Sequence, residues 1–247
     1  MDDLALLEVL FAASTAARAA LDELDDWGPN GERPGQYRLD VAADAAAVAT
    51  LSDAGISILS EESGRTDGPL PLLAVLDPID GSTNAHRGIP IYSTSICVFD
   101  ADGPRVGTVV NHCSRQRYHA IRASGAWRDG VAISPSNCEV LSDSVVGLSG
   151  SLSGGLASWQ YRTLGCASLE FCAVADGSLD ANVLGKGVSL RPWDYLAGLL
   201  ICAEAGAPVS ELDGRDPWIR SDSPRRPVAA GTHGLLQACL LYTSRCV

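Results

Sequence analysis

Apolar residues near the start of the chain recur every three or four positions, as they do on one face of an α-helix. This face covers Leu6–Leu24, and the acidic Asp2 and Asp3 lie just before it, where negative charge favours the start of a helix. The next segment, Trp27–Gly35, holds three glycines and two prolines and therefore predicts a loop. A second, alanine-rich helix is predicted over Ala42–Ser52.

Two short apolar runs predict buried strands, and each run ends in acidic residues. The first is Ile56–Ser63 (ISILSEES) and the second is Leu72–Pro78 (LLAVLDP). Over Tyr92–Ile133, β-rich segments are separated by the turn signals DADGP and RDG, which predicts an antiparallel meander. The Ser- and Gly-rich stretch Gly147–Gly155 predicts a connection.

Helices and strands are also predicted to alternate in the C-terminal part of the chain. We expect a helix over Ala167–Ala175, a strand over Leu179–Leu184, a helix over Pro192–Gly206 and a short strand over Pro227–Ala230. The tail Leu241–Val247 shows no period that predicts an element. The sequence contains no internal repeat, so it does not indicate a repeat architecture.

Charge and hydropathy exclude several classes of partner. The 247 residues are 46% hydrophobic, which is enough for an independent core, and 18 basic residues face 30 acidic ones for a net charge of −12. We therefore expect no nucleic acid and no membrane as partner. The wholly apolar runs are far shorter than the ~20 residues that cross a bilayer, and the N-terminus is acidic, which predicts a cytoplasmic protein. Eight cysteines without a CxxC pair predict reduced thiols.

The stretch DPIDGSTN, Asp77–Asn84, combines two acids with a sharp turn. Asp77 and Asp80 are three residues apart at the end of a predicted strand, and Gly81 allows the chain to turn, so their carboxylates can converge. The small polar residues that follow favour a helix start with free N–H groups, which suits an anion. A solvated β-turn with an N-cap is the alternative interpretation.

Acidic residues elsewhere in the sequence favour the metal-site interpretation. Glu61 and Glu62 end the other buried strand, and Asp194 lies in the first turn of an apolar helix. Converging carboxylates without enough Lys or Arg nearby need a cation. Oxygen ligands favour Mg²⁺ or Mn²⁺, whereas the four histidines lack the spacing of a zinc site.

Three motifs together resemble the inositol monophosphatase family of metal-dependent, lithium-sensitive phosphatases, whose superfamily includes fructose-1,6-bisphosphatases and bisphosphate nucleotidases. They are SEES (Ser60–Ser63), DPIDGSTN (Asp77–Asn84) and WDYLAGLLICAEAG (Trp193–Gly206), in the order found in the family. The resemblance implies an α/β (α+β) fold, a layered αβαβα sandwich of mixed and antiparallel sheets. It also implies one phosphatase unit over residues 1–247, loosely divided into a metal-site lobe, 1–146, and a substrate lobe, 156–247.

The resemblance also implies a metal site with two or three Mg²⁺ ions, or Mn²⁺ in their place. Glu61, Asp77 and the carbonyl of Ile79 would hold the first ion. Asp77, Asp80 and Asp194 would hold the second. Such an enzyme would hydrolyse a phosphate monoester by two-metal activation of water, without a covalent intermediate.

Catalytic and substrate-binding residues follow from the same resemblance. Ser82 and Asp44 would orient the attacking water, and Glu61 counts with them as catalytic. The substrate-binding set would be Asp80, Gly81, Ser82, Thr83, Gly165, Cys166, Ala167 and Asp194. The partner would be a small phosphorylated alcohol or sugar, and the family implies a homodimer.

The identity of the alcohol is the open question. Inositol-1-phosphate leads, but Leu184 stands where animal inositol monophosphatases carry a glutamate that contacts the ring. The alternatives are a 3′(2′),5′-bisphosphate nucleotidase, a fructose-1,6-bisphosphatase and a histidinol-phosphate phosphatase. Basic residues that could hold a second phosphate, or be solvated charges, are Arg33, Arg162, Lys186 and Arg191. An inactive binding relative is a further alternative, which the complete set of metal carboxylates disfavours.

Overall fold

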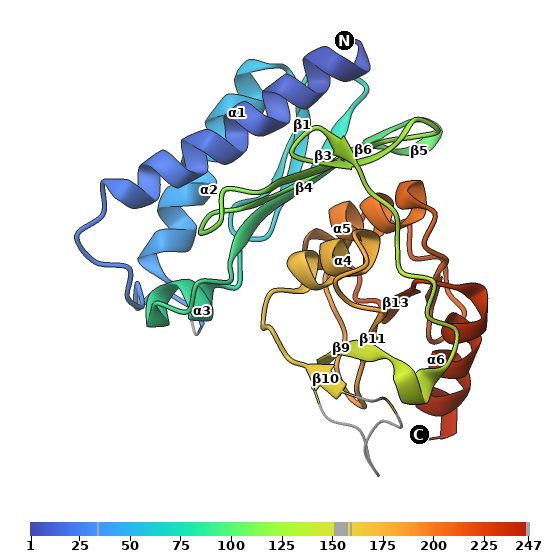
Figure 1. The fold of residues 1–247 in the computed structure, drawn as a ribbon. Coiled ribbons are helices and arrows are strands. Elements are labelled where there is room, and N and C mark those ends of the chain that lie inside the picture. Colours follow the sequence, from blue (N-terminus) through green and yellow to red (C-terminus); the bar gives the residue numbers. More distant parts are fainter. Residues whose placement is uncertain (34, 151–157, 159, 246–247) are drawn as a thin grey trace.

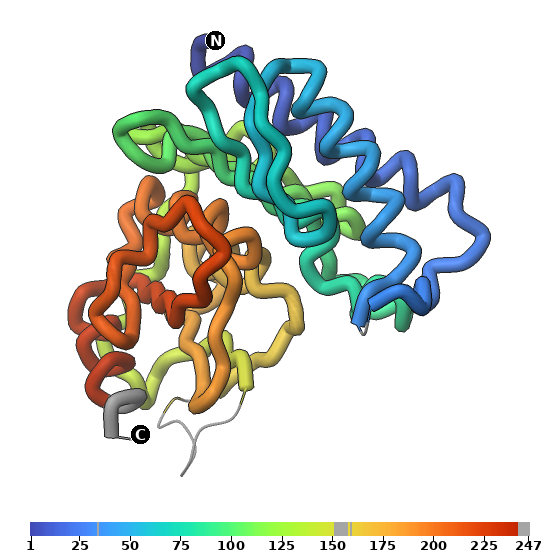
Figure 2. The backbone as a smooth tube through the Cα atoms, turned by 180° about the vertical axis from the view of Figure 1, so that it is seen from behind, coloured from blue at the N-terminus to red at the C-terminus, as the bar shows by residue number. Residues whose placement is uncertain are grey.

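The structure of the chain is a computed structural model that describes residues 1–33, 35–150, 158 and 160–245. Helices and sheets alternate through it in five layers (Figure 1). Two long helices cover one face of an eight-stranded sheet, two more helices lie between that sheet and a five-stranded sheet, and the last helix covers the second sheet. Figure 2 shows the same succession from behind. The predicted α/β class and αβαβα sandwich are confirmed.

The helices form largely where the apolar periodicity places them. Their bounds are α1 (Asp3–Asp22), α2 (Arg38–Asp53), α3 (Ser82–Arg87), α4 (Ala167–Ala175), α5 (Pro192–Ala205) and α6 (His233–Arg245). The predicted α1, α4 and α5 are confirmed, and Asp2 caps α1 by accepting a hydrogen bond from the Ala5 amide at 2.8 Å. The start predicted for α2 is wrong: the helix begins at Arg38 rather than at Ala42, because Asp40 accepts a hydrogen bond from the Tyr37 amide at 2.9 Å.

The first sheet carries the acidic strand ends and the meander. Its order is β2-β1-β3-β4-β5-β6-β7-β8. The bounds are β1 (Ser57–Ser60), β2 (Gly64–Thr66), β3 (Leu73–Asp80), β4 (Ser93–Asp100), β5 (Gly103–Asn111), β6 (Arg117–Ile121), β7 (Gly125–Arg128) and β8 (Val131–Ala132). Only β1 and β3 pair in parallel, so the predicted antiparallel meander is confirmed. The first strand ends at Ser60, which leaves Glu61 and Glu62 in a turn.

The second sheet contains a strand where the sequence predicts a connection. Its order is β10-β9-β11-β13-β12. The bounds are β9 (Val145–Ser149), β10 (Gln160–Arg162), β11 (Ala181–Leu184), β12 (Val209–Glu211) and β13 (Pro227–Ala230). Gly147 lies inside β9. A Cβ at this position would come within 2.7 Å of Asn182 Oδ1, so the glycine allows β9 to pack closely against Asn182 and does not mark a flexible link. Residues 151–155 of the predicted connection lie outside the described residues.

Two further corrections concern the C-terminal end and the hydropathy of the first helix. α6 was not predicted, yet Leu235, Leu236 and Cys239 on it are buried with β9, β11 and β13. α1 has the length and hydropathy of a membrane span, with a mean hydropathy of 1.6 over 18 residues. Its Leu6 and Leu10, however, are fully buried in the core shared with α2 and the first sheet, so packing explains this composition.

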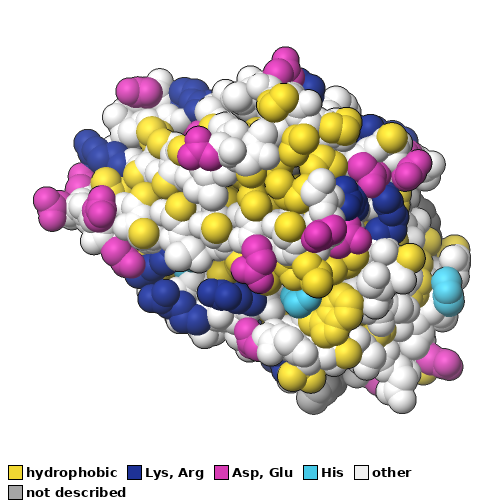
Figure 3. Space-filling view, turned by 90° about the horizontal axis from the view of Figure 1, so that it is seen from above, with side chains coloured by type: hydrophobic (Ala, Val, Ile, Leu, Met, Phe, Trp, Pro, Cys, Tyr) yellow, Lys and Arg dark blue, Asp and Glu magenta, His cyan; other side chains and the backbone are white. Residues whose placement is uncertain are grey.

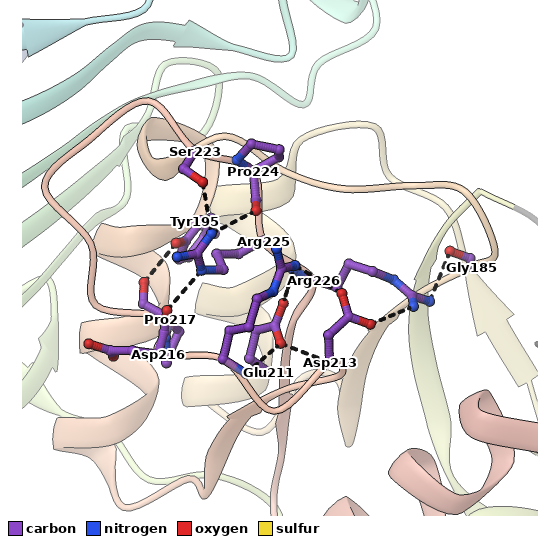
Figure 4. Close-up of polar contacts among 11 residues, drawn as sticks. Gly185, Tyr195, Glu211, Asp213, Asp216, Pro217, Ser223, Pro224, Arg225 and Arg226 are labelled. Carbon is purple, nitrogen blue, oxygen red and sulfur yellow. Dashed lines mark hydrogen bonds and ion pairs between the residues drawn. The ribbon is translucent and has the colours of Figure 1, made fainter.

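A polar network holds the segment that leads into α5 (Figure 4). The buried Glu211 accepts hydrogen bonds from the amides of Asp213 and Arg226, at 2.7 and 2.9 Å, and pairs with Arg215. Next to it, Arg225 and Leu190 exchange two backbone hydrogen bonds of 2.8 and 2.9 Å. The long connection between β12 and β13 is thereby fixed to the residues just before α5.

Candidate metal centre

Three carboxylates from three separate elements meet at the edge of the first sheet. Asp77 lies on β3, Glu61 follows β1, and Asp194 lies in the first turn of α5. Each offers an oxygen atom, and the three oxygens lie within 4.8 Å of one another. The parallel register of β1 and β3, with Ser60 opposite Leu76, brings the first two acids out at the same end of the sheet.

No basic side chain of the described residues forms an ion pair with these three acids. The Oδ1 atom of Asp77 is buried and has no hydrogen-bond partner within the described part of the chain. The Arg191 guanidinium is paired with Asp222 at 2.7 Å, and only the Arg191 amide reaches Asp194, also at 2.7 Å. A buried anionic oxygen without a partner is costly, so this donor set fits a divalent cation with oxygen ligands.

Burial and mutual repulsion raise the pKa of all three carboxyl groups in the cluster. Burial, then the charge of Glu61, raises the pKa of Asp77 well above its usual range. Burial, then the charge of Asp80, raises the pKa of Asp194 to about 7. Glu61 keeps an exposed edge, yet the protein packed around its carboxyl, followed by the charge of Asp194, raises its pKa to about 8. Without a cation the cluster therefore holds protons near neutral pH.

Asp80 is not one of the three residues whose oxygens lie within 4.8 Å of one another, although burial together with its charge raises the pKa of Asp194. Its Oδ2 accepts hydrogen bonds from the Ser168 amide at 2.7 Å and from the Cys166 thiol at 3.2 Å, at the start of α4. The second predicted ligand set was Asp77, Asp80 and Asp194. The structure brings Asp77 and Asp194 together, while Asp80 links β3 to α4. The predicted contact residue Cys166 thus serves Asp80 through its side chain.

The water-orienting acid of the sequence analysis requires a correction. Asp44 does not reach Ser82; its Oδ1 accepts a hydrogen bond from the Ser60 hydroxyl. Asp40, one helical turn earlier, interacts with Ser82. Burial raises the pKa of Asp40 to about 6, opposed by the nearby Ser82 side chain and by the hydrogen bond from the Tyr37 amide. The proximity of Asp40 to Ser82 is a contact between α2 and the start of α3, and no local sequence signal identifies it.

The turn after β3 is built for close packing. Gly81 has a φ of 88°, and a Cβ on it would lie 2.9 Å from the Ile91 carbonyl, so only glycine fits. Ser82 Oγ donates to the Ile79 carbonyl at 2.7 Å, and the Thr83 hydroxyl lies 3.2 Å from that of Tyr37. Asn84 Nδ2 donates to the Leu164 carbonyl at 2.8 Å and to the carbonyls of Ile91 and Gly165. This amide joins the turn to the segment before α4.

Two buried side chains stabilise the site and were not identified from the sequence. Glu170 on α4 accepts a hydrogen bond from the Leu164 amide at 2.7 Å and so fixes the segment before Cys166. Behind β3, Thr94 donates to the Pro78 carbonyl at 2.8 Å. A buried strand position carries no outward sign of such a partner, because its neighbours come from distant parts of the chain.

A cleft of about 330 Å³ opens beside the cluster. It is lined by Arg33, Gly35, Gln36, Glu61, Glu62, Arg191, Trp193 and Asp222. Arg33 is held by Glu62 at 2.7 Å, and both Arg33 and Arg191 remain about half exposed. Arg162 and Lys186 do not line it. Leu184 is fully buried in β11 and presents no polar group to a ligand.

Comparison with known proteins gives a consistent result. The model of the inositol monophosphatase family matches residues 30–247. A fructose-1,6-bisphosphatase/inositol-1-monophosphatase of Archaeoglobus fulgidus is 36% identical over 179 residues, covering 71% of this chain and 69% of that protein. An inositol-1-monophosphatase of Mesorhizobium japonicum is 29% identical, covering 96% and 95%. A solved Pyrococcus horikoshii structure, described as similar to inositol-1 monophosphatase, has a TM-score of 0.82 at 26% identity, covering 96% of both chains.

The raised pKa values predict how pH controls metal binding. Asp194 and Glu61 have pKa values raised to about 7 and about 8, so the metal-free folded chain holds their protons more tightly than the unfolded chain does. Their contribution to the stability of the metal-free fold is therefore present at low pH and is lost as the pH rises through these two values. Since a cation binds the deprotonated ligands, the rise in Tm caused by a fixed excess of Mg²⁺ should increase over the same pH window. Thermal unfolding with and without Mg²⁺ measures this difference. A stabilisation that is independent of pH from about 6 to about 9 would contradict the assignment.

Proposed function

The chain belongs to the inositol monophosphatase family of phosphatases, and we propose that it hydrolyses a small phosphate monoester with Mg²⁺ as cofactor, inositol-1-phosphate being the leading substrate. The observation that carries the proposal is the cluster of Glu61, Asp77 and Asp194 with its unpartnered buried oxygen. When bound, Mg²⁺ lowers the pKa of water and neutralises phosphate charge. We also propose a homodimer, from the family resemblance, and a cytoplasmic location.

The chain's own residues supply ligands, a proton acceptor and orientation. Glu61, Asp77 and Asp194 would hold the cation. Asp40 is ionised above about pH 6, and its Oδ1 has no hydrogen-bond partner among the described residues. If the Ser82 hydroxyl turns away from the Ile79 carbonyl, it can give its proton to Oδ1 of Asp40 and take one from the attacking water. Asp80, fixed by the Ser168 amide, keeps its position relative to α4. The predicted substrate contacts at Gly81, Thr83, Gly165 and Ala167 belong to this proposal.

The cleft supports a second candidate, fructose-1,6-bisphosphatase. Arg33 and Arg191 line the same cleft as Glu61 and are each held by a single acid, so both can turn a guanidinium toward a second phosphate. The Archaeoglobus fulgidus relative is named for both activities. The buried Leu184 offers no hydrogen-bonding group to an inositol ring. This weakens the case for inositol-1-phosphate as the substrate and leaves the metal chemistry unaffected.

Replacing Asp40 or Asp44 by asparagine tests the proton path. Asp40→Asn should lower kcat by about a hundredfold, because it removes the acceptor of the proton, while the stabilisation by Mg²⁺ persists. Asp44→Asn, one helical turn away, is the matched control and should keep most of the activity because its contact is Ser60. Phosphate release from inositol-1-phosphate with Mg²⁺ present and absent is the measurement. Equal losses in the two variants, or activity that survives a chelator, would overturn the mechanism.

The two arginines separate the substrate classes. Arg33→Gln and Arg191→Gln should raise the KM for fructose-1,6-bisphosphate about tenfold, by loss of a charge-assisted hydrogen bond, and change the KM for inositol-1-phosphate little. Arg65→Gln, on the exposed strand β2, is the control. Adenosine 3′,5′-bisphosphate and histidinol phosphate complete the panel. If both KM values rise together, the arginines serve the site in general rather than a second phosphate.

A further inference from the structure

A second, smaller pocket lies away from the cleft, between α1 and the turn that joins β5 to β6. Its volume is about 110 Å³. It is lined by Phe11, Ser14, Thr15, Arg18, Val110, His112, Arg115 and Arg117. Three of these side chains are guanidinium groups, and none of the lining residues is acidic. In a chain with a net charge of −12, such a concentration of positive charge needs a physical explanation.

Two of the three arginines of this pocket, Arg115 and Arg117, lack an internal counter-ion among the described residues. Among the described residues, Arg115 and Arg117 have no carboxylate within 4.0 Å, in contrast to Arg18, which pairs with the exposed Asp22 at 2.5 Å. The Arg117 guanidinium lies 5.2 Å from the centre of the Phe11 ring, which orients it without neutralising it. On the face drawn in Figure 3, Lys and Arg side chains gather at more than one place. Three guanidinium groups that line one small pocket without an acidic lining residue favour a bound anion.

Side-chain hydrogen bonds hold the backbone of the turn that carries Arg115. The Asn111 side chain accepts hydrogen bonds from the amides of Cys113 and Ser114, at 2.9 and 3.0 Å. Arg115 follows with a φ of 66°, a left-handed conformation in which glycine or asparagine would be the ordinary choice. An arginine here places a charge at the pocket where the turn itself requires none. These hydrogen bonds fix the backbone from which Arg115 extends, while its exposed guanidinium can adjust to a ligand.

The chemistry of the wall selects the ligand. Ser14 and Thr15 donate their hydroxyl protons to the carbonyls of Leu10 and Phe11, at 3.0 and 2.8 Å, so they offer oxygen lone pairs rather than donors. Burial and the nearby arginines Arg18 and Arg115 lower the pKa of His112 to about 4, so this ring is neutral. The guanidinium groups are thus the anion-binding elements, and their planar forks match a tetrahedral oxyanion.

We propose that the pocket formed by Arg18, Arg115 and Arg117 binds a phosphate-sized dianion, separate from the metal centre. The volume is about a third of that of the cleft, which suits one phosphate group rather than a nucleotide. The ligand is inorganic phosphate or the phosphate group of a metabolite whose remainder projects out of the pocket. This site does not depend on the activity proposed above, because it uses none of the residues of the metal centre.

Calorimetric titration with inorganic phosphate, in the presence of a chelator, tests the proposal. The full chain should bind phosphate, and the double variant Arg115→Gln/Arg117→Gln should bind at least about tenfold more weakly. The matched control is Arg65→Gln, on the exposed strand β2, which should bind as the wild type does. The variant Arg33→Gln/Arg191→Gln reports whether phosphate binds in the cleft instead. Thermal unfolding without phosphate checks that the pocket variant is folded and at least as stable as the wild type, since it removes repulsion.

The outcomes separate the possibilities. Loss of binding in the cleft variant with retention in the pocket variant would overturn the proposal, and so would the absence of binding to the wild type. Glycerol 3-phosphate, titrated in the same way, distinguishes the source of the ligand. Tighter binding of this monoester than of inorganic phosphate identifies a metabolite, whereas weaker binding identifies the free ion.

Discussion

The fold depends on one electrostatic constraint, which is that three carboxylates lie within 4.8 Å of one another with no cationic side chain of the described residues paired to them. Repulsion between Glu61, Asp77 and Asp194, together with burial, opposes this arrangement in the metal-free chain. The surrounding structure must therefore hold the acids in place, and a divalent cation must offset their charge. The metal-free fold is destabilised at this cluster, and the same arrangement allows the protein to bind a cation, as is common at functional sites.

The support for the cluster comes from elements that are far apart in the sequence. The parallel pairing of β1 with β3 fixes Glu61 relative to Asp77, while the network around Glu211 fixes the segment before Asp194. Asp80 and Asn84 connect the turn after β3 to the segment at the start of α4. Both sheets thus contribute to one site, which explains why its residues are spread over most of the chain.

Much of this site could be predicted from the sequence, because its ligands lie at strand ends and helix starts that have local signatures. The choice between Asp40 and Asp44 could not be settled by apolar periodicity, since the two acids lie one turn apart on the same face of α2. Their tertiary contacts decide it, because Asp40 lies near Ser82 and Asp44 contacts Ser60. Gly147 was misinterpreted because its glycine is required by Asn182, a tertiary contact that leaves no local trace. Neither Glu170 nor the network of Glu211 has a motif of its own.

The most direct test of the central claim is a calorimetric titration of Mg²⁺ into the wild type and into Asp77→Asn. Asp77 contributes the buried oxygen that has no partner, so its replacement removes a ligand and a repulsive charge together. The account predicts that the variant binds Mg²⁺ more weakly by about a hundredfold or more and is at least as stable as the wild type when both are free of metal. Unchanged Mg²⁺ affinity in a folded Asp77→Asn would contradict it.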